Sequence, residues 1–198
     1  MRTAALASLV LILAAPAARA DCKEEILTAL DRLTNGSPYR SEGVVTAGTG
    51  RIELSSEVVP PDGVRTRQTV GDRTSEMLKI GDRIWVKRPE GWREMPAAMA
   101  ASVAQAMTNM KMRAPNLVAD VDCSGVRSID GKDSLVYTYK LDLPGGSAST
   151  TLYVDPVSHL PARMLVEQGG ADKRTVDTRY TYDASLKLEP PQVDPAAK

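Results

Sequence analysis

Residues able to carry out catalysis are few in this sequence. The single histidine, His159, lies in the turn sequence DPVSHLP, and no cysteine or acidic cluster stands beside it at metal-ligand spacing. The chain contains no GxSxG nucleophile motif, no HExxH zinc motif and no phosphate-binding glycine loop. Acidic pairs such as Asp120 and Asp122 occur, and distant carboxylates could converge in a cleft. We therefore expect a protein that is not an enzyme and that needs no metal or other cofactor.

The two cysteines, Cys22 and Cys123, lie far apart in the sequence. In an oxidising compartment such a pair favours a disulfide, here between the start of the mature chain and its middle. The alternative is a redox or catalytic thiol, but no CxxC motif supports it. We predict the Cys22–Cys123 disulfide.

The first twenty residues, MRTAALASLVLILAAPAARA, have the layout of a secretory signal peptide. Arg2 precedes an apolar stretch over residues 4–15, and the segment ends in the small-x-small triplet ARA. The apolar stretch is short for a membrane span. We predict that residues 1–20 are a signal peptide, cleaved after Ala20. Asp21 then precedes Cys22, which argues against lipid attachment at that cysteine.

The charge of the mature chain is close to balanced. Removal of Arg2 and Arg19 leaves 23 Lys and Arg against 25 Asp and Glu, a net charge of −2. No long run of one sign and no basic stripe occurs, so we expect no nucleic-acid partner. The mature length suits one domain, which we place at residues 21–189. Residues 190–198, with three prolines, are expected to form an extended tail.

Helical and strand patterns alternate along the mature chain. Residues 22–36 carry apolar residues at helical spacing, with Glu24 and Glu25 in the first turn. Short β-rich runs then fill residues 37–93 and resume after Pro115, giving roughly ten or eleven strands. Hairpin signals such as Gly71-Asp72 and Gly81-Asp82 leave no room for crossover helices. These patterns predict an α+β fold with an antiparallel sheet.

The stretch EMPAAMAASVAQAMTNMK interrupts the strands with a second helical pattern. Pro96 suits the first helical turn, and no charge occurs between Glu94 and Lys111. Five of the eight methionines lie at positions 95–112. Methionine is flexible and polarizable, so such a helix face could line a binding site for a changing apolar partner. It could equally be ordinary core packing under the sheet.

Two tryptophans add to the candidate binding residues, because the chain has no phenylalanine. Each lies beside a turn: Trp92 could line the mouth of a cavity, and Trp85 could equally be an ordinary strand residue. The candidate ligand-binding residues are therefore Met95, Met99, Val103, Met107, Met110, Trp85 and Trp92.

Three stretches resemble one known family. They are VVPPDGVRTRQTVGDRTSEMLKIGDRIWVKRPEGWREMP, DCSGVRSIDGKDSLVYTYKLD and LYVDPVSHLPARMLVEQ. Their Pro-Asp strand start, Gly-Asp-x-x-Trp hairpin, Gly-Trp turn, Asp-Pro turn and Leu-Pro-x-Arg are similar to the LolA/LolB-like superfamily of periplasmic lipoprotein carriers. The order of helix, strands, small-residue helix and strands is also similar.

The resemblance implies an unclosed β-barrel whose concave face is covered by helices, with an apolar cavity between them. Carriers of this type are expected to take up acyl chains of lipoproteins or other lipids in the periplasm. A basic residue in the sheet is expected to control lid closure, and Arg65, Arg67, Arg73 and Arg83 all lie in or near candidate strands.

Two functional hypotheses follow. The first is a periplasmic carrier or binder of a lipid-like ligand, such as a lipoprotein acyl chain or a free lipid. The second is an interaction or sensor module on the same fold, which has a filled core and binds another envelope protein.

Overall fold

The structure is a computed structural model that describes residues 17–129, 131–143, 146–169 and 173–193. Within these ranges, the side chains of residues 17–21, 109–115 and 142–143 are not described. Two helices and eleven strands follow the predicted order of helix, strand meander, helix and second meander.

The first half of the chain contains helix α1 and six strands. Their bounds are α1 Ala17–Asn35, β1 Tyr39–Ala47, β2 Gly50–Val59, β3 Gly63–Val70, β4 Arg73–Ile80, β5 Arg83–Arg88 and β6 Gly91–Glu94. The second half contains α2 Ala97–Leu117, β7 Val118–Ile129, β8 Lys132–Leu143, β9 Gly146–Val154, β10 Pro161–Gln168 and β11 Arg174–Tyr182.

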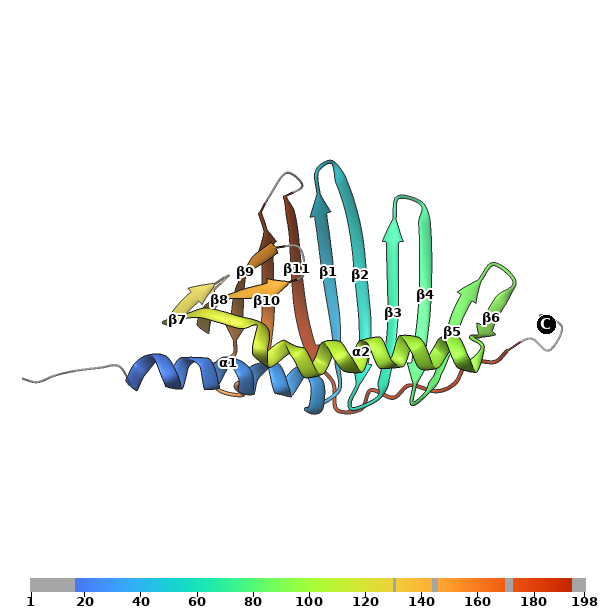
Figure 1. Ribbon diagram of the computed structural model, residues 1–198, viewed down its shortest axis with the longest axis horizontal. Helices are drawn as coiled ribbons and strands as arrows, with labels where there is room; N and C mark the ends of the chain where they lie inside the picture. The colour runs from blue at the N-terminus through green and yellow to red at the C-terminus, as the bar shows by residue number, and fades with distance from the viewer. Residues whose placement is uncertain (1–16, 130, 144–145, 170–172, 194–198) are drawn as a thin grey trace, which may run out of the picture.

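All eleven strands belong to one antiparallel sheet (Figure 1). Its order is β6-β5-β4-β3-β2-β1-β11-β10-β9-β8-β7, so the first and last strands of the chain pair at its centre. The two meanders are thereby joined into a single sheet with β6 and β7 at its edges. The sheet is curved and does not close, which confirms the predicted unclosed barrel.

Two-residue turns set the register of the first meander. Gly71 and Gly81 have φ angles of 55° and 58°, which glycine adopts without steric cost. The predicted hairpins at Gly71-Asp72 and Gly81-Asp82 therefore connect β3 to β4 and β4 to β5.

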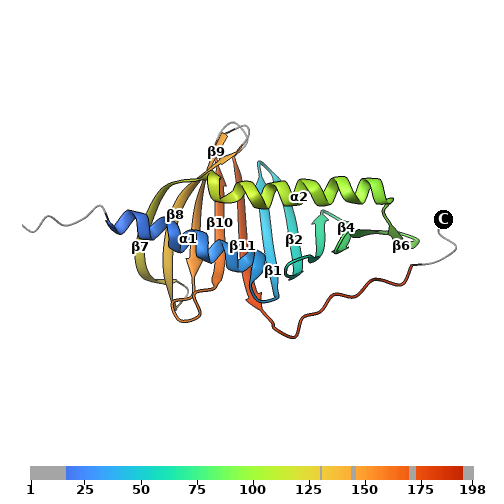
Figure 2. The same cartoon turned by 60° about the horizontal axis from the view of Figure 1, so that its bottom comes forward.

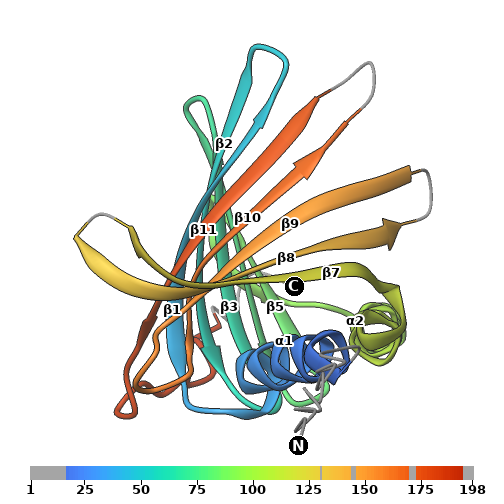
Figure 3. The ribbon, with the colours of Figure 1, turned by 90° about the vertical axis from the view of Figure 1, so that its left-hand side faces the viewer.

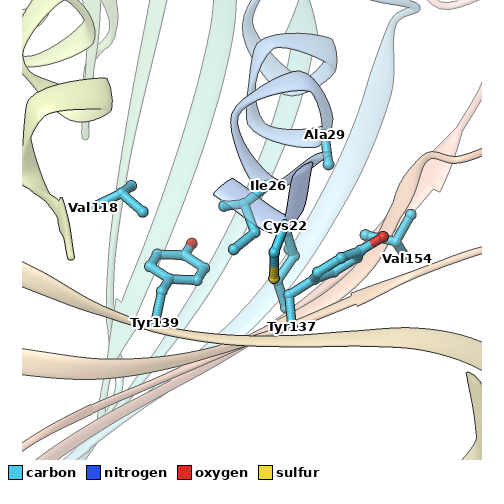
Figure 4. Close-up of a cluster of buried hydrophobic side chains, with 8 residues drawn as sticks. Cys22, Ile26, Ala29, Val118, Tyr137, Tyr139 and Val154 are labelled. Carbon is cyan, nitrogen blue, oxygen red and sulfur yellow. The ribbon is translucent and has the colours of Figure 1, made fainter. Parts of the chain in front are cut away.

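Both helices lie on one side of the curved sheet, which we call the concave face (Figure 3). Helix α1 packs on β7 and β10, and it buries Ile26 completely in a cluster with Tyr137, Tyr139 and Leu152 (Figure 4). Side chains alternate between the faces along each strand, and directly paired residues share a face. The strand register therefore assigns each strand residue to the concave face or to the opposite, convex face.

The predicted disulfide is present between Cys22 of α1 and Cys123 of β7, with the two Cα atoms 5.9 Å apart. It closes a loop with a sequence separation of 101 residues. The bond fixes the first helix of the described chain to an edge strand of the sheet.

The segment after β11 runs along the lower ends of the strands toward β6 (Figure 2). Leu186 is buried, Leu188 packs beside Gly63, and Val193 forms a parallel bridge with Trp92. Part of the expected tail thus contacts the sheet.

Among the described residues, no helix has the length and apolarity needed to cross a membrane.

Candidate functional site: the concave face beneath α2

Helix α2 connects the two edges of the sheet (Figure 1). It starts after β6, ends at β7, and makes its principal contacts with β5 on one side and with β7 and β8 on the other. Its 21 residues span about 31 Å at 1.5 Å per residue. The helix therefore crosses in front of the central strands while it is anchored at the two ends of the sheet.

The central strands present apolar side chains to the concave face. Starting from Tyr137 and Leu152, which pack against α1, the register assigns the following residues to that face: Val166, Val176, Val45, Ile52, Leu54, Val58, Val64, Val70 and Met77. Val45 is buried, but most of the others are only half-buried, and Val70 is 47% exposed. Below α2 the sheet therefore has an apolar surface that the described chain covers incompletely.

A tyrosine cluster closes the lower end of this surface. The ring of Tyr39 lies 5.7 Å from that of Tyr180 and 5.8 Å from that of Tyr182. Burial raises the pKa of Tyr39 to about 12, so its hydroxyl stays neutral at physiological pH. Tyr137 donates a hydrogen bond of 2.7 Å to Oε2 of Glu25 on α1. These contacts join the helix to the sheet without placing a phenolate in the apolar region.

The predicted methionine face lies on α2 and at the end of β6. Met95 follows β6, and its amide bonds the carbonyl of Ile84, a concave-face residue. Met99 is 58% exposed, whereas Val103 and Met107 on the same helix face are half-buried. Met110 falls in the stretch of α2 whose side chains lie outside the described residues. The described part of this set is thus accessible along α2.

The two tryptophans are separated from the methionines. Trp85 pairs with Leu78, and Trp92 pairs with Lys87, which places both on the convex face. Trp85 is 1% exposed, and the guanidinium of Arg83 lies 4.6 Å from its ring. The structure therefore brings neither tryptophan to the apolar surface beneath α2.

The register also separates the four arginines considered for lid control. Arg65, Arg67 and Arg83 lie on the convex face, where Arg65 and Arg67 flank the buried carboxylate of Glu76. Arg73, at the start of β4, is the one of the four on the concave face. The β3–β4 turn, which directly precedes it, lies at the end of the sheet away from the helices (Figure 1).

The residues weighed for catalysis do not converge. His159 is exposed, and Asp120 forms an ion pair of 2.6 Å with Lys140 that lowers the pKa of its carboxyl. Asp122 accepts a hydrogen bond from Ser124. Within the described ranges, no group of three His, Cys, Asp or Glu side chains could hold a metal ion.

Sequence reasoning missed the strand residues of the site, including Ile52, Leu54 and Val70. Their period-two alternation with polar neighbours was the available signal. These residues form one surface only because the strand register aligns the apolar positions of six strands, β1–β4, β10 and β11, on one face.

Several hollows lie outside this surface. A groove of about 470 Å³ on the convex side is lined by charged residues including Glu42, Glu53, Arg67 and Asp177. Another, of about 440 Å³, lies between α1 and β8–β9, beside Glu25 and His159.

Solved structures of other proteins share the architecture of this chain, although its sequence matches no family model. No protein-family model matches the sequence, and no curated protein matches it. Lipoprotein LppX of Mycobacterium tuberculosis superposes with a TM-score of 0.57 at 16% identity, covering 86% of this chain and 99% of LppX. MucB gives a TM-score of 0.50 at 15% identity over 89% of this chain, which spans 64% of the MucB chain. As the sequence resemblance predicted, this chain has the LolA-like unclosed-barrel fold.

Proposed function

We propose that this chain is an exported, non-enzymatic protein that binds the acyl chain of a lipid or lipoprotein on the concave face beneath α2. One observation carries the proposal: α2 is anchored at the ends of the sheet, while the apolar side chains between them remain partly exposed. Contiguous, incompletely covered apolar surface is typical of a binding site. The similarity of fold to LppX, a lipoprotein, supports a role at a cell envelope by analogy.

Three features support this assignment. The described part of α2 up to Thr108 has no charged side chain, so it can contact hydrocarbon without burying a charge. Met99 and Met107 are adaptable contacts for a flexible chain. The Cys22–Cys123 disulfide suits an oxidising compartment, in agreement with export by a cleaved signal peptide over residues 1–20.

Native mass spectrometry of the gently purified mature protein tests the proposal. We expect an added mass that is released by organic solvent and identified as a lipid. Met99→Lys and Val103→Lys should abolish this added mass, because a lysine ammonium would have to be desolvated against the hydrocarbon. Val157→Lys is the matched control, since Val157 is 88% exposed in a turn.

The stability of these variants separates binding from folding. Met99 is 58% exposed, so Met99→Lys should change the free energy of unfolding by no more than about 0.5 kcal/mol. A wild-type protein that is folded but takes up no lipid in any preparation would contradict the proposal.

A second candidate function is an envelope protein-interaction or sensor module. The observation that favours it is the convex groove of about 470 Å³, whose mixed charges suit a polar partner better than a hydrocarbon chain. In that case Arg67→Ala at the groove should impair partner capture, and Met99→Lys should leave it intact.

A further inference from the structure

Charged side chains are divided unequally between the two faces of the sheet. Strands β1–β6, β10 and β11 contain seven acidic residues, and the register places every one on the convex face: Glu42, Glu53, Glu57, Glu76, Glu94, Glu167 and Asp177. The concave face of these strands has no acidic residue. An acidic side chain of β8, Asp133, does share the concave side, close to the β7–β8 turn.

The concave face of the same eight strands carries five basic residues instead: Arg73, Lys79, Arg88, Arg93 and Arg174. Lys79 is buried near the lower end of β4, where its Nζ donates to the carbonyl of Asp62 at 3.3 Å. Arg174, at the start of β11, has none of the other four on an adjacent strand. The other three lie on the adjacent strands β4, β5 and β6.

Basic residues on the two faces differ in how they are neutralised. On the convex face, Arg65 pairs with Glu57 at 3.2 Å, and Arg83 pairs with Glu94 at 2.7 Å. In the described part of the chain, Arg73, Arg88 and Arg93 form no ion pair, and all three are exposed. The positive charge of these three concave arginines is therefore not cancelled by a carboxylate on the same face.

These three arginines border the apolar surface. Arg93 pairs with Val86, which in turn pairs with Met77 on the concave face, and Arg73 pairs with Val70. Asp72 and Glu90 stand nearby in the turns at this end of the sheet, outside the strands. Hydrocarbon contacts and guanidinium donors thus lie next to each other on β3–β6.

We propose that the ligand of the concave face is an amphiphile with an anionic head group, which the Arg73–Arg88–Arg93 cluster binds while the apolar strand residues hold its chain. The inference rests on the proposed lipid-binding function and specifies its ligand class. Guanidinium groups form strong charge-assisted hydrogen bonds to carboxylate and phosphate. Beside a low-dielectric apolar surface their attraction for an anion is stronger than in bulk water.

Equilibrium dialysis with two radiolabelled probes of identical chain tests this inference. Delipidated protein is equilibrated with oleate or with oleyl alcohol, below the concentration at which either aggregates. We expect oleate to bind about tenfold more tightly than the alcohol, from one charge-assisted contact. Raising the salt concentration should weaken the binding of oleate and leave that of the alcohol unchanged.

Variants assign the effect to the cluster. Arg73→Gln combined with Arg93→Gln should reduce oleate affinity to that of the alcohol, without changing the affinity for the alcohol. Arg51→Gln is the control, because Arg51 is also an exposed arginine but lies on the convex face. Acetate and inorganic phosphate, tested as competitors, show whether a free small anion can replace the lipid head group. Neither should displace oleate at comparable concentration.

The outcomes separate the two proposals. Equal affinity for oleate and oleyl alcohol would overturn the anionic head group and leave lipid binding standing. Failure of both probes to bind would overturn both. Displacement of oleate by acetate or phosphate at equal concentration would show an anion site that is independent of the apolar surface, which also overturns the inference.

Discussion

Asp183 joins the last strand to the segment that follows it. Its carboxylate accepts hydrogen bonds from the amide and hydroxyl of Ser185, and its Oδ2 lies 2.7 Å from a guanidinium nitrogen of Arg40. Its own amide donates to the carbonyl of Pro38 at 3.0 Å. The Ser185 hydroxyl first, and then Arg40, lower the pKa of Asp183 from 3.8 to about 2.

This depressed pKa predicts a pH-dependent contribution to stability. A carboxyl whose pKa is lower in the folded state stabilises it above the unfolded-state value, and the contribution is lost as the pH falls from about 3.8 toward 2. Asp183→Asn should therefore be less stable than wild type at pH 6, and the difference should disappear near pH 2. Urea unfolding at several pH values measures this. A difference that persists undiminished at pH 2 would contradict the assignment.

For single residues, the sequence predicted a covalent partner better than it predicted the face of the sheet on which a side chain lies. The Cys22–Cys123 disulfide was predictable because the chain has two cysteines, so each has one possible partner within the chain. The facing of Trp85 was not, because a one-residue change of register would move it to the other side of the sheet. The division of the arginines between the two faces depends on the same register, so the sequence could not predict it either.

Among the elements, hairpin turns and apolar periodicity predicted both helices and the two meanders. The second helix differs at its end: α2 continues through Pro115 to Leu117, where a strand was expected directly after the proline. Strand β7 departs from a regular ladder between Ala119 and Asp122 and again between Cys123 and Gly125. Gly125, with a φ of 70°, allows this second irregularity. Such bulges have no strong sequence signal.

The disulfide between α1 and β7 should stabilise the fold as a constraint on the unfolded chain. For a separation of 101 residues, the chain-entropy relation gives at most about 4.7 kcal/mol, and measured values are commonly about 2–4 kcal/mol. Cys22→Ala combined with Cys123→Ala should lower the free energy of unfolding by that amount in denaturant titrations. Reductant should produce the same loss in wild type and no further loss in the double variant. An unchanged unfolding midpoint would show that α1 is held by packing alone.

At the scale of the whole molecule, the pairing of β1 with β11 is the main feature that local sequence patterns could not predict. Each meander was predictable from its turns, but their junction is a contact between opposite ends of the chain. That junction creates one continuous sheet, and α2 connects its two edge strands, β6 and β7. The apolar surface beneath α2 is a property of this assembly, which explains why the sequence pattern pointed to the methionines of α2 and not to the strand residues of the surface.

The segment 183–193 completes the convex side of the same assembly. Leu78 and Trp85 lie on that side and are almost completely buried, although both helices are on the other face. Leu186 is buried, Leu188 packs beside Gly63, and Val193 bridges to Trp92. We infer that this segment, more than any helix, covers the lower ends of β3–β6.

Deletion of residues 186–198 should therefore expose a convex apolar surface that includes Trp85. We expect the free energy of unfolding to fall by about 2–5 kcal/mol, the value for exposing two or so large apolar side chains, together with a red shift of tryptophan emission. Leu186→Ala should reproduce part of the loss, whereas Val157→Ala, at a residue 88% exposed, should have no effect. Because the apolar surface beneath α2 lies on the opposite face, a deletion variant that remains folded should still carry lipid in native mass spectrometry. Unchanged tryptophan emission and stability would show that the segment does not cover Trp85.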